Sequence, residues 1–164
     1  MLIKMRKELN FVRTKYSVGG VTLLPSKEAV MPLVRIDLNN THSPESVRNI
    51  ADAIHSAIVA VYAIPPRDRF QIINRHEPGS IIAEDAGLGF ERSDGVVMIQ
   101  IFTQEGRTPE VKQELYARIA SELAEVGVAG EDVFIGYVEN TFNDWSFGFG
   151  KAQYALGELA VPQA

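Results

Sequence analysis

The sequence has 164 residues, 46% of them apolar and 23% charged, and a net charge of -5 at pH 7. This length predicts one domain with a sizeable core, and the absence of cysteine excludes disulfides, thiolate zinc sites, iron–sulfur clusters and a cysteine nucleophile. The acidic balance argues against nucleic-acid binding, and no apolar run approaches the ~18 residues of a membrane span, so a cytoplasmic location is expected.

Residues 1–30 differ in charge from the rest of the chain. They carry six Lys and Arg residues against two Glu, a balance of +4, which leaves -9 for the other 134 residues. The segment lacks the continuous apolar stretch of roughly 7–15 residues found in a secretory signal. We predict that residues 1–30 are a basic N-terminal extension, either a short strand with a tail or a stretch that the mature protein does not keep. Residues 31–164 then form the domain.

The domain is predicted to begin with a strand and a helix. The strand spans residues 33–38, a run rich in β-branched and other apolar residues. Ser43 is a good N-cap for a helix that begins at Pro44, where the missing N–H costs nothing. Glu45 complements the positive end of the helix dipole.

The same pattern returns 65 positions later, after a link of residues 76–94 that is rich in turn formers. A strand is predicted at residues 97–102, and Thr108-Pro109-Glu110 falls on Ser43-Pro44-Glu45. Links as long as this one are often functional.

Both predicted helices carry one apolar stripe at helical spacing, and a second strand follows each helix. The first helix should stop near residues 64–66 and be followed by strand 69–74; the second should stop near 127–130 and be followed by strand 133–139. The stripes correspond residue by residue: Ile50 with Leu115, Ile54 with Ile119, Ile58 with Leu123, and Val61 with Val126.

The sequence therefore predicts a tandem β-α-β fold, with repeat units at about 32–75 and 97–140. Its class is an α/β (α+β) sandwich, with two helices on one face of a mixed four-stranded sheet. Because residues 96–101 are apolar at nearly every position, we expect both faces of that strand to be buried. Other copies of the chain would cover the second face in a symmetric homo-oligomer. The spacing of the three histidines matches no metal-ligand pattern, so no metal site is expected.

Three short motifs accompany the tandem repeat: residues 31–35 (MPLVR), 106–108 (GRT) and 144–148 (DWSFG). With the tandem repeat they make residues 31–156 resemble the tautomerase superfamily, nearest to malonate semialdehyde decarboxylase and its tautomerase relatives. This resemblance implies a homotrimer, no cofactor, and catalysis by the secondary amine of an amino-terminal proline.

The resemblance assigns that catalytic role to Pro32. Pro32 becomes terminal only if translation starts at Met31 and the methionine is removed. Within a chain the proline nitrogen is an amide without basicity, whereas a terminal amine can have its pKa drawn toward 7 by a low-dielectric site with nearby cations. Without the resemblance, Pro32 is an ordinary proline at the start of a strand.

The resemblance also implies the other site residues. Asp68 matches an aspartate thought to activate water in the decarboxylase, and Arg107 resembles an arginine that binds the substrate carboxylate. Trp145 and Phe147 would form an apolar wall of a substrate site that includes Gln104. The decarboxylase pattern has two arginines after the third strand, whereas residues 104–107 (QEGR) supply one. Each residue also has an explanation without a catalytic or binding role. Asp68 would belong to a solvated charge cluster, Arg107 would be a loop cation, and the aromatic side chains would only pack against one another.

Three hypotheses for function follow. The first is a cofactor-free tautomerase that catalyses keto–enol proton transfer on a 2-oxo acid such as phenylpyruvate, which the single arginine favours. The second is a malonate semialdehyde decarboxylase or hydratase, a lyase acting on a 3-oxo acid, with a cationic Pro32 and with Asp68 directing water. The third is a catalytically silent trimeric binding module, which applies if residues 1–30 are retained.

Overall fold

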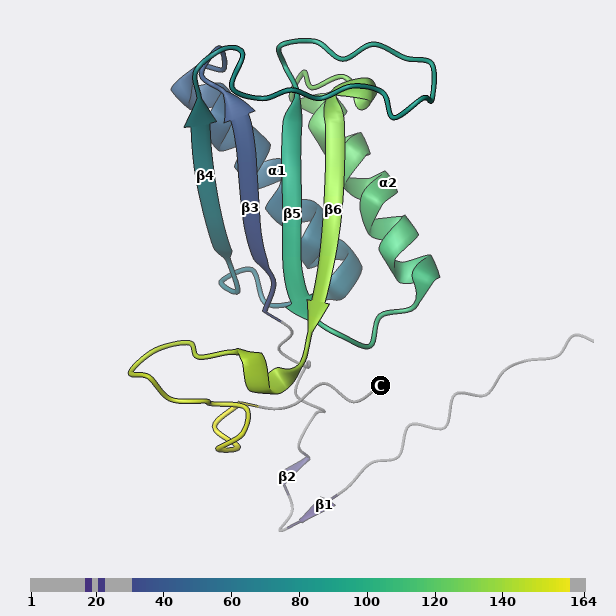
Figure 1. Ribbon diagram of the computed structural model, residues 1–164. Helices are drawn as coiled ribbons and strands as arrows, with labels where there is room; N and C mark the ends of the chain where they lie inside the picture. Colours follow the sequence, from purple (N-terminus) through teal and green to yellow (C-terminus); the bar gives the residue numbers. More distant parts are fainter. Residues whose placement is uncertain (1–16, 19–20, 23–30, 160–164) are drawn as a thin grey trace, which may run out of the picture.

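The structure, a computed structural model, describes residues 17–18, 21–22 and 31–159 (Figure 1). Two short strands, β1 (Ser17–Val18) and β2 (Val21–Thr22), pair antiparallel. Apart from these four residues, the predicted basic extension lies outside the described residues. The domain itself begins with β3 (Leu33–Asn39), α1 (Pro44–Tyr62) and β4 (Phe70–His76).

The second unit repeats this order. It consists of β5 (Val97–Gln104), α2 (Pro109–Glu125) and β6 (Val133–Asn140), with a short 3-10 helix, η1 (Gly130–Asp132), before the last strand. A second 3-10 helix, η2 (Phe142–Asp144), begins the C-terminal segment. The predicted tandem β-α-β fold is therefore confirmed.

The four long strands form one mixed sheet in the order β4-β3-β5-β6. Within each unit the strands are parallel, and β3 and β5 join the two units antiparallel. Leu33 pairs with both Phe70 and Phe102, and Gln104 pairs with Asn140. The amino ends of β3 and β4 and the carboxyl ends of β5 and β6 consequently meet at one edge of the sheet (Figure 1). We call it the proline edge, because Pro32 precedes β3 there.

Both helices begin where the sequence predicts. The Ser43 hydroxyl accepts a hydrogen bond from the Ser46 backbone N–H at 3.1 Å, and the Thr108 hydroxyl accepts one from Val111 at 3.4 Å. The first helix ends at Tyr62, and the next residue, Ala63, adopts a left-handed conformation with φ of 53°. Pro65 disfavours a helical conformation for the residue before it, so the chain turns away here toward β4.

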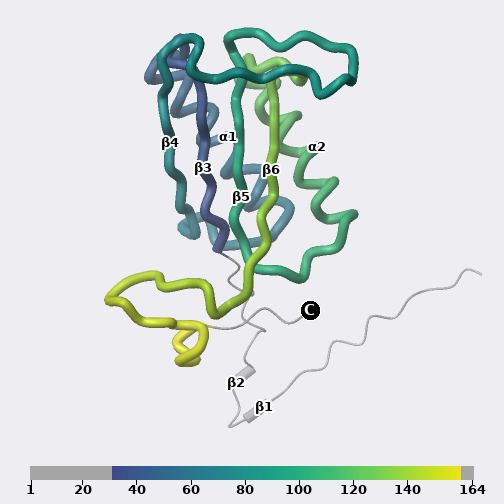
Figure 2. The backbone as a smooth tube through the Cα atoms, viewed as in Figure 1, coloured from purple at the N-terminus to yellow at the C-terminus, as the bar shows by residue number. Residues whose placement is uncertain are grey.

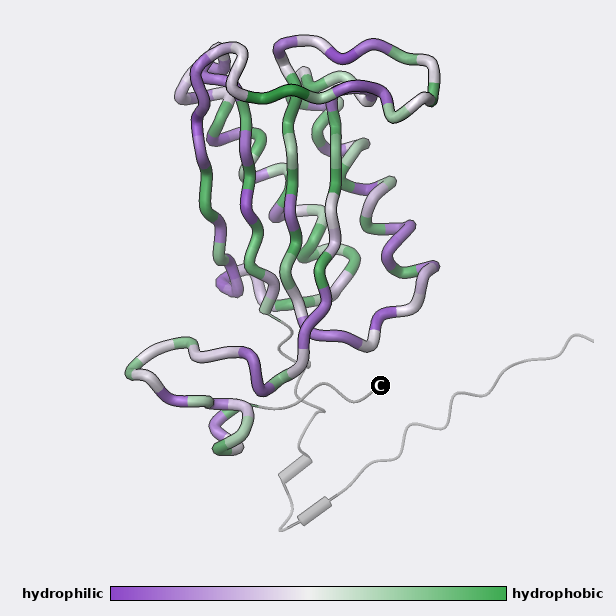
Figure 3. Tube along the Cα trace, viewed as in Figure 1, coloured by the Kyte–Doolittle hydropathy of each residue, from purple (hydrophilic) through white to green (hydrophobic). Residues whose placement is uncertain are grey.

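The core lies between the two helices and one face of the sheet. Its fully buried side chains include six of the eight predicted stripe residues and alternate residues of β3 and β5: Ile50, Ile54, Ile58, Leu115, Ile119, Leu123, Val34, Ile36, Ile99 and Ile101. The other two predicted stripe residues, Val61 and Val126, are partly buried and pack against this core. Side chains alternate between the two faces of the sheet along each strand, and along β3 hydrophobic and hydrophilic residues alternate with them (Figure 3). This period of two places polar and remaining apolar side chains on the opposite, open face.

The open face lacks a helical cover (Figure 2). Four of its large apolar side chains are 43–49% exposed: Phe70, Ile72, Phe134 and Val138. The link between the units crosses only the end of this face remote from the proline edge (Figure 1). Among the described residues, no helix is long and apolar enough to cross a membrane.

Strand ends are where the prediction differs from the structure. β3, β4 and β5 each continue one or two residues beyond the predicted strands, into polar side chains. Thr103 and Gln104 still pair with Glu139 and Asn140 of β6. Backbone hydrogen bonds between neighbouring strands determine where these strands end, and a hydropathy pattern contains no information about them.

Candidate active site

Pro32 lies buried at the proline edge, directly before the first paired residue of β3. Its nitrogen is bonded to Met31 in this chain and is therefore an amide. Burial raises the pKa of the Tyr154 phenol, and a hydrogen bond between its hydroxyl and the Met31 backbone opposes this increase. Pro32 thus lies one residue from a buried tyrosine of the C-terminal segment.

Asp68 lies at the same edge, two residues before β4. A tight turn places it there: its backbone N–H donates to the Pro65 carbonyl at 2.9 Å, and His55 Nε2 lies 2.8 Å from the Pro66 carbonyl. Asp68 is 9% exposed, and both of its carboxyl oxygens are buried without a hydrogen-bond partner among the described residues. Burial raises the pKa of Asp68, and nearby His55 opposes this effect. An unpaired buried carboxylate is costly, which favours a cationic partner or ligand beside it.

Gln104 and Arg107 contribute polar groups from the end of β5 and the loop after it. Gln104 is 1% exposed, and its side-chain N–H donates to the Tyr154 hydroxyl at 3.2 Å. Arg107 Nη1 donates to Thr103 Oγ1 at 3.0 Å and to the Gln104 carbonyl at 3.1 Å. The Arg107 guanidinium also lies over the ring of Tyr62, 3.8 Å from its centroid.

The C-terminal segment supplies an aromatic wall beyond the proline edge (Figure 1). The rings of Trp145 and Phe147 are stacked, with centroids 5.7 Å apart and planes at 6°. Phe147 also contacts Tyr154 edge-on at 5.5 Å and Phe70 at 6.2 Å. Trp145 Nε1 donates to the side chain of Asn140 at 2.7 Å, which ties the wall to the end of β6.

Tyr154 connects these groups. It is 4% exposed, and burial is the main cause that raises the pKa of its hydroxyl. The negative charge of Asp68 raises this pKa further, while Arg107 lowers it, so both charges act on the phenol. A carboxylate, a guanidinium, an amide and a protonated phenol therefore lie at the same edge of the sheet as Pro32. Such a site can bind an anionic oxo acid and donate hydrogen bonds to its oxygens.

Comparisons with known proteins identify the family. Two family models, each described as tautomerase enzyme, match residues 68–148 and 32–91. The probable tautomerase YrdN of Bacillus subtilis is 38% identical over 130 residues, which cover 79% of this chain and 100% of that protein. The chain belongs to the tautomerase family. It is an enzyme of this superfamily, as its motifs predict.

Solved structures place the tautomerase more narrowly. It is similar to a malonate semialdehyde decarboxylase inhibited by 3-bromopropiolate, with 62% identity, a TM-score of 0.77, and coverage of 79% of this chain and 99% of that one. A fused 4-OT, described as a symmetric trimer, shares the fold with 21% identity and a TM-score of 0.63, covering 76% of this chain and 98% of that one.

The tautomerase brings all six predicted site residues to one edge of the sheet: Pro32, Asp68, Gln104, Arg107, Trp145 and Phe147. Their catalytic and binding roles stay predictions. Among the described residues, no group of three or more His, Asp or Glu side chains could hold a metal ion.

Sequence reasoning missed Tyr62 and Tyr154. Tyr62 ends a helix, where an aromatic residue reads as part of the apolar stripe, and Tyr154 stands in a segment without periodicity or motif. The only available signal for Tyr154 was its position close behind the aromatic motif of residues 144–148.

Proposed function

We propose that the chain decarboxylates malonate semialdehyde, a 3-oxo acid, and that Pro32 is its catalytic amino terminus. The observation that carries this proposal is the buried carboxylate of Asp68, which has no hydrogen-bond partner in the described part of the chain and lies at the same edge as Pro32. The 62% identity to a malonate semialdehyde decarboxylase supports it. The proposal thus favours the second of the three sequence hypotheses.

The charge of Asp68 decides the protonation state of a terminal Pro32. An α-amino group has a pKa of about 7.7–8.0 in model peptides, and a nearby opposite charge raises the pKa of a cation. Asp68 therefore favours a protonated, cationic Pro32 at pH 7. A cationic amine can polarise a carbonyl, as decarboxylation requires, whereas keto–enol tautomerisation begins with a neutral amine that removes a proton.

The proposed reaction uses the groups around Pro32 in sequence. Arg107 binds the substrate carboxylate, and the Pro32 ammonium donates a hydrogen bond to the 3-oxo oxygen. The bond between the carboxyl carbon and C2 breaks, carbon dioxide leaves, and the electron pair moves to the oxo oxygen, which takes the proton of Pro32. The resulting enol is converted to acetaldehyde as C2 gains a proton from solvent and the enol O–H proton returns to the Pro32 amine, so one solvent proton is consumed overall. The aromatic wall of Trp145 and Phe147 excludes water and favours neutral carbon dioxide over a charged carboxylate.

Two observations support an active protein that begins at Pro32. One family model starts its match at residue 32. The probable tautomerase YrdN and the malonate semialdehyde decarboxylase are matched over 99–100% of their length by 79% of this chain.

Assay of protein that begins at Pro32 tests the proposal. We expect carbon dioxide and acetaldehyde in equal amounts from malonate semialdehyde, measured by gas release and by a coupled NADH assay for acetaldehyde. Intact mass confirms the amino terminus before the assay. Protein with this terminus that releases no carbon dioxide would contradict the proposed function.

A second candidate is tautomerisation of a 2-oxo acid such as phenylpyruvate. Arg107 is the one arginine in the loop after β5, and its neighbours Gln104 and Tyr154 are neutral. A site with less positive charge binds small acids less selectively, which favours a tautomerase that accepts a range of 2-oxo acids. Ketonisation of phenylpyruvate enol without release of carbon dioxide from malonate semialdehyde would select it. Absence of both activities would select the silent binding module.

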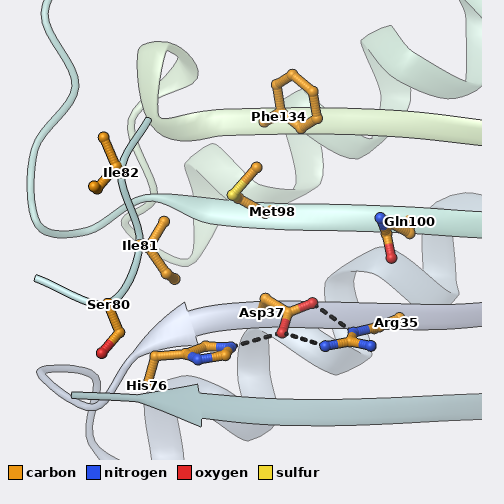
Figure 4. A pocket seen from close by; sticks show the side chains of 9 residues that line it. All are labelled: Arg35, Asp37, His76, Ser80, Ile81, Ile82, Met98, Gln100 and Phe134. Atoms are coloured by element: carbon orange, nitrogen blue, oxygen red, sulfur yellow. Dashed lines mark hydrogen bonds and ion pairs between the residues drawn. The ribbon is translucent and has the colours of Figure 1, made fainter. Parts of the chain in front are cut away.

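We also propose that the enzyme is a homotrimer in which other copies of the chain cover the open face. Exposed apolar residues of β4 and β6 gather there, and a fused 4-OT of the same fold is described as a trimer. The charged groups on this face are paired. Asp37 accepts hydrogen bonds from Arg35 at 2.8 Å and His76 at 2.6 Å (Figure 4). Burial alone would raise the pKa of Asp37, but these bonds hold it below its ordinary value, so Asp37 remains an ionised partner when the face is covered.

Substitutions on the open face test the assembly. We expect the parent protein to have the mass of three chains by light scattering after size exclusion, and Ile72→Glu with Phe134→Asp to reduce it to one. A buried unpaired charge at an interface costs several kcal/mol per group. Ala117→Glu on the exposed side of α2 is the matched control and should keep the mass of three chains. A monomeric parent, or a trimeric double variant, would refute this assembly.

A further inference from the structure

The guanidinium of Arg107 lies over the ring of Tyr62, a residue to which the proposed mechanism gives no role. The guanidinium carbon is 3.8 Å from the centroid of the Tyr62 ring. Tyr62 is the last residue of α1, whereas Arg107 lies in the loop after β5, next to Gly106 with φ of 117°. A cation over an aromatic face is attracted by the ring quadrupole, most strongly where water is excluded.

The Tyr62 ring is itself fixed. Its hydroxyl forms a 2.8 Å hydrogen bond with the hydroxyl of Tyr137 in β6, and Tyr116 of α2 packs edge-on against Tyr137 with centroids 6.3 Å apart. Burial and the bond to Tyr137 raise the pKa of Tyr62, while Arg107 opposes the increase. The hydroxyl stays protonated, so the ring is a neutral platform anchored to the other unit of the fold.

The platform determines which edge of the guanidinium faces outward. Arg107 Nη1 is engaged by Thr103 and by the Gln104 carbonyl. Neither Nε nor Nη2 forms a hydrogen bond with the described part of the chain. The Tyr62 ring fixes the plane of the Arg107 guanidinium, and the two acceptors at the end of β5 fix its Nη1 atom. The edge that carries Nε and Nη2 is left for two parallel hydrogen bonds to a carboxylate.

We propose that Tyr62 is a positioning residue for substrate binding. Its ring, anchored by Tyr137, holds the Arg107 guanidinium in the plane in which its free edge pairs with the substrate carboxylate. This inference rests on the proposed function in one respect, because it requires a ligand that carries a carboxylate. It predicts an effect on binding of any small dicarboxylate or oxo acid, whether or not the chemistry that follows is decarboxylation.

Substitutions that separate the ring from the hydroxyl test the role of Tyr62. In protein beginning at Pro32, Tyr62→Leu removes the ring, and we expect a roughly tenfold weaker Kd for malonate by calorimetry. The KM for malonate semialdehyde should rise by a similar factor, with kcat within about threefold of the parent. Tyr62→Phe keeps the ring and should restore malonate binding to within about threefold of the parent. Tyr137→Phe removes the same hydrogen bond between the two hydroxyls and should likewise keep malonate binding within about threefold of the parent.

Controls make the outcome specific. Phe90 lies beneath Arg92 in the link between the units, 5.0 Å from the guanidinium carbon. Phe90→Leu therefore removes a similar contact away from the site and should leave Kd and KM unchanged. Arg107→Gln should abolish malonate binding. Parent protein that does not bind malonate, or Tyr62→Leu protein that folds by circular dichroism and binds malonate as tightly as the parent, would overturn the inference. Malonate binding without turnover of malonate semialdehyde would reject the proposed function alone.

Discussion

The 164-residue chain with residues 1–31 retained will have no measurable decarboxylase or tautomerase activity, and protein beginning at Pro32 will have full activity. An amide nitrogen carries no ionisable proton and no basic lone pair, so it can neither donate to the oxo oxygen nor accept a proton from C2. We expect the side chains of Asp68, Arg107 and Tyr154 to be in place in both forms, so that the two proteins differ at the site only in the proline nitrogen. The loss of activity should therefore be complete and not graded. Intact-mass measurement followed by assay of both proteins with malonate semialdehyde and phenylpyruvate provides the comparison.

Substitution within the short form separates the chemistry from the fold. Pro32→Ala in protein beginning at this position retains an amine but loses the ring that fixes its direction, and we expect kcat to fall about 100-fold. The circular dichroism spectrum should not change, because Pro32 precedes the first paired residue of β3. Equal activity of the long and short proteins, with the long form verified by mass after the assay, would rule out a terminal proline.

Most of the fold could be predicted because its signals are local. Ser43 and Thr108 cap helices whose prolines occupy the first helical position, and these preferences operate within one turn. The correspondence between Ile54 and Ile119 identified the repeated unit, since both lie on the buried side of an amphipathic helix. Strand ends were less predictable, because pairing such as that of Gln104 with Asn140 depends on a partner distant in the sequence.

The candidate site was predictable only in part for the same reason. Pro32, Asp68 and Arg107 stand next to strand ends, where a motif can indicate their position. Tyr154 reaches the site by the path of the C-terminal segment, and Tyr62 by the crossing of α1 behind β5, so tertiary packing alone brings them to Gln104 and Arg107. No spacing in the sequence encodes either contact.

Replacement of Asp68 by asparagine will affect activity and stability in opposite directions. Asparagine preserves the shape of the side chain and removes its charge, which in the proposed function keeps Pro32 cationic. We expect kcat for malonate semialdehyde to fall at least 100-fold in protein beginning at Pro32, the lower end of the effect of an acid–base group. Glu122→Gln is the matched control, because it removes the same single negative charge from an ion pair with Arg118 on the surface of α2. It should leave kcat unchanged.

The stability effect follows from the raised pKa of Asp68. Folding favours the protonated carboxyl, so the stabilisation it contributes is present below the ordinary pKa of about 3.9 and is lost as pH rises through the higher folded value. In the 164-residue chain the Asp68 carboxyl has no hydrogen-bond partner among the described residues, so the cost of ionising it grows with pH. Asp68→Asn should therefore raise the melting temperature at pH 7, with a smaller gain near pH 4. In protein beginning at Pro32 we expect the terminal ammonium to pair with Asp68, so the gain at pH 7 should shrink or reverse. Melting curves of the four proteins at both pH values therefore measure the coupling between Asp68 and the proline amine, and identical gains in the long and short forms would exclude it.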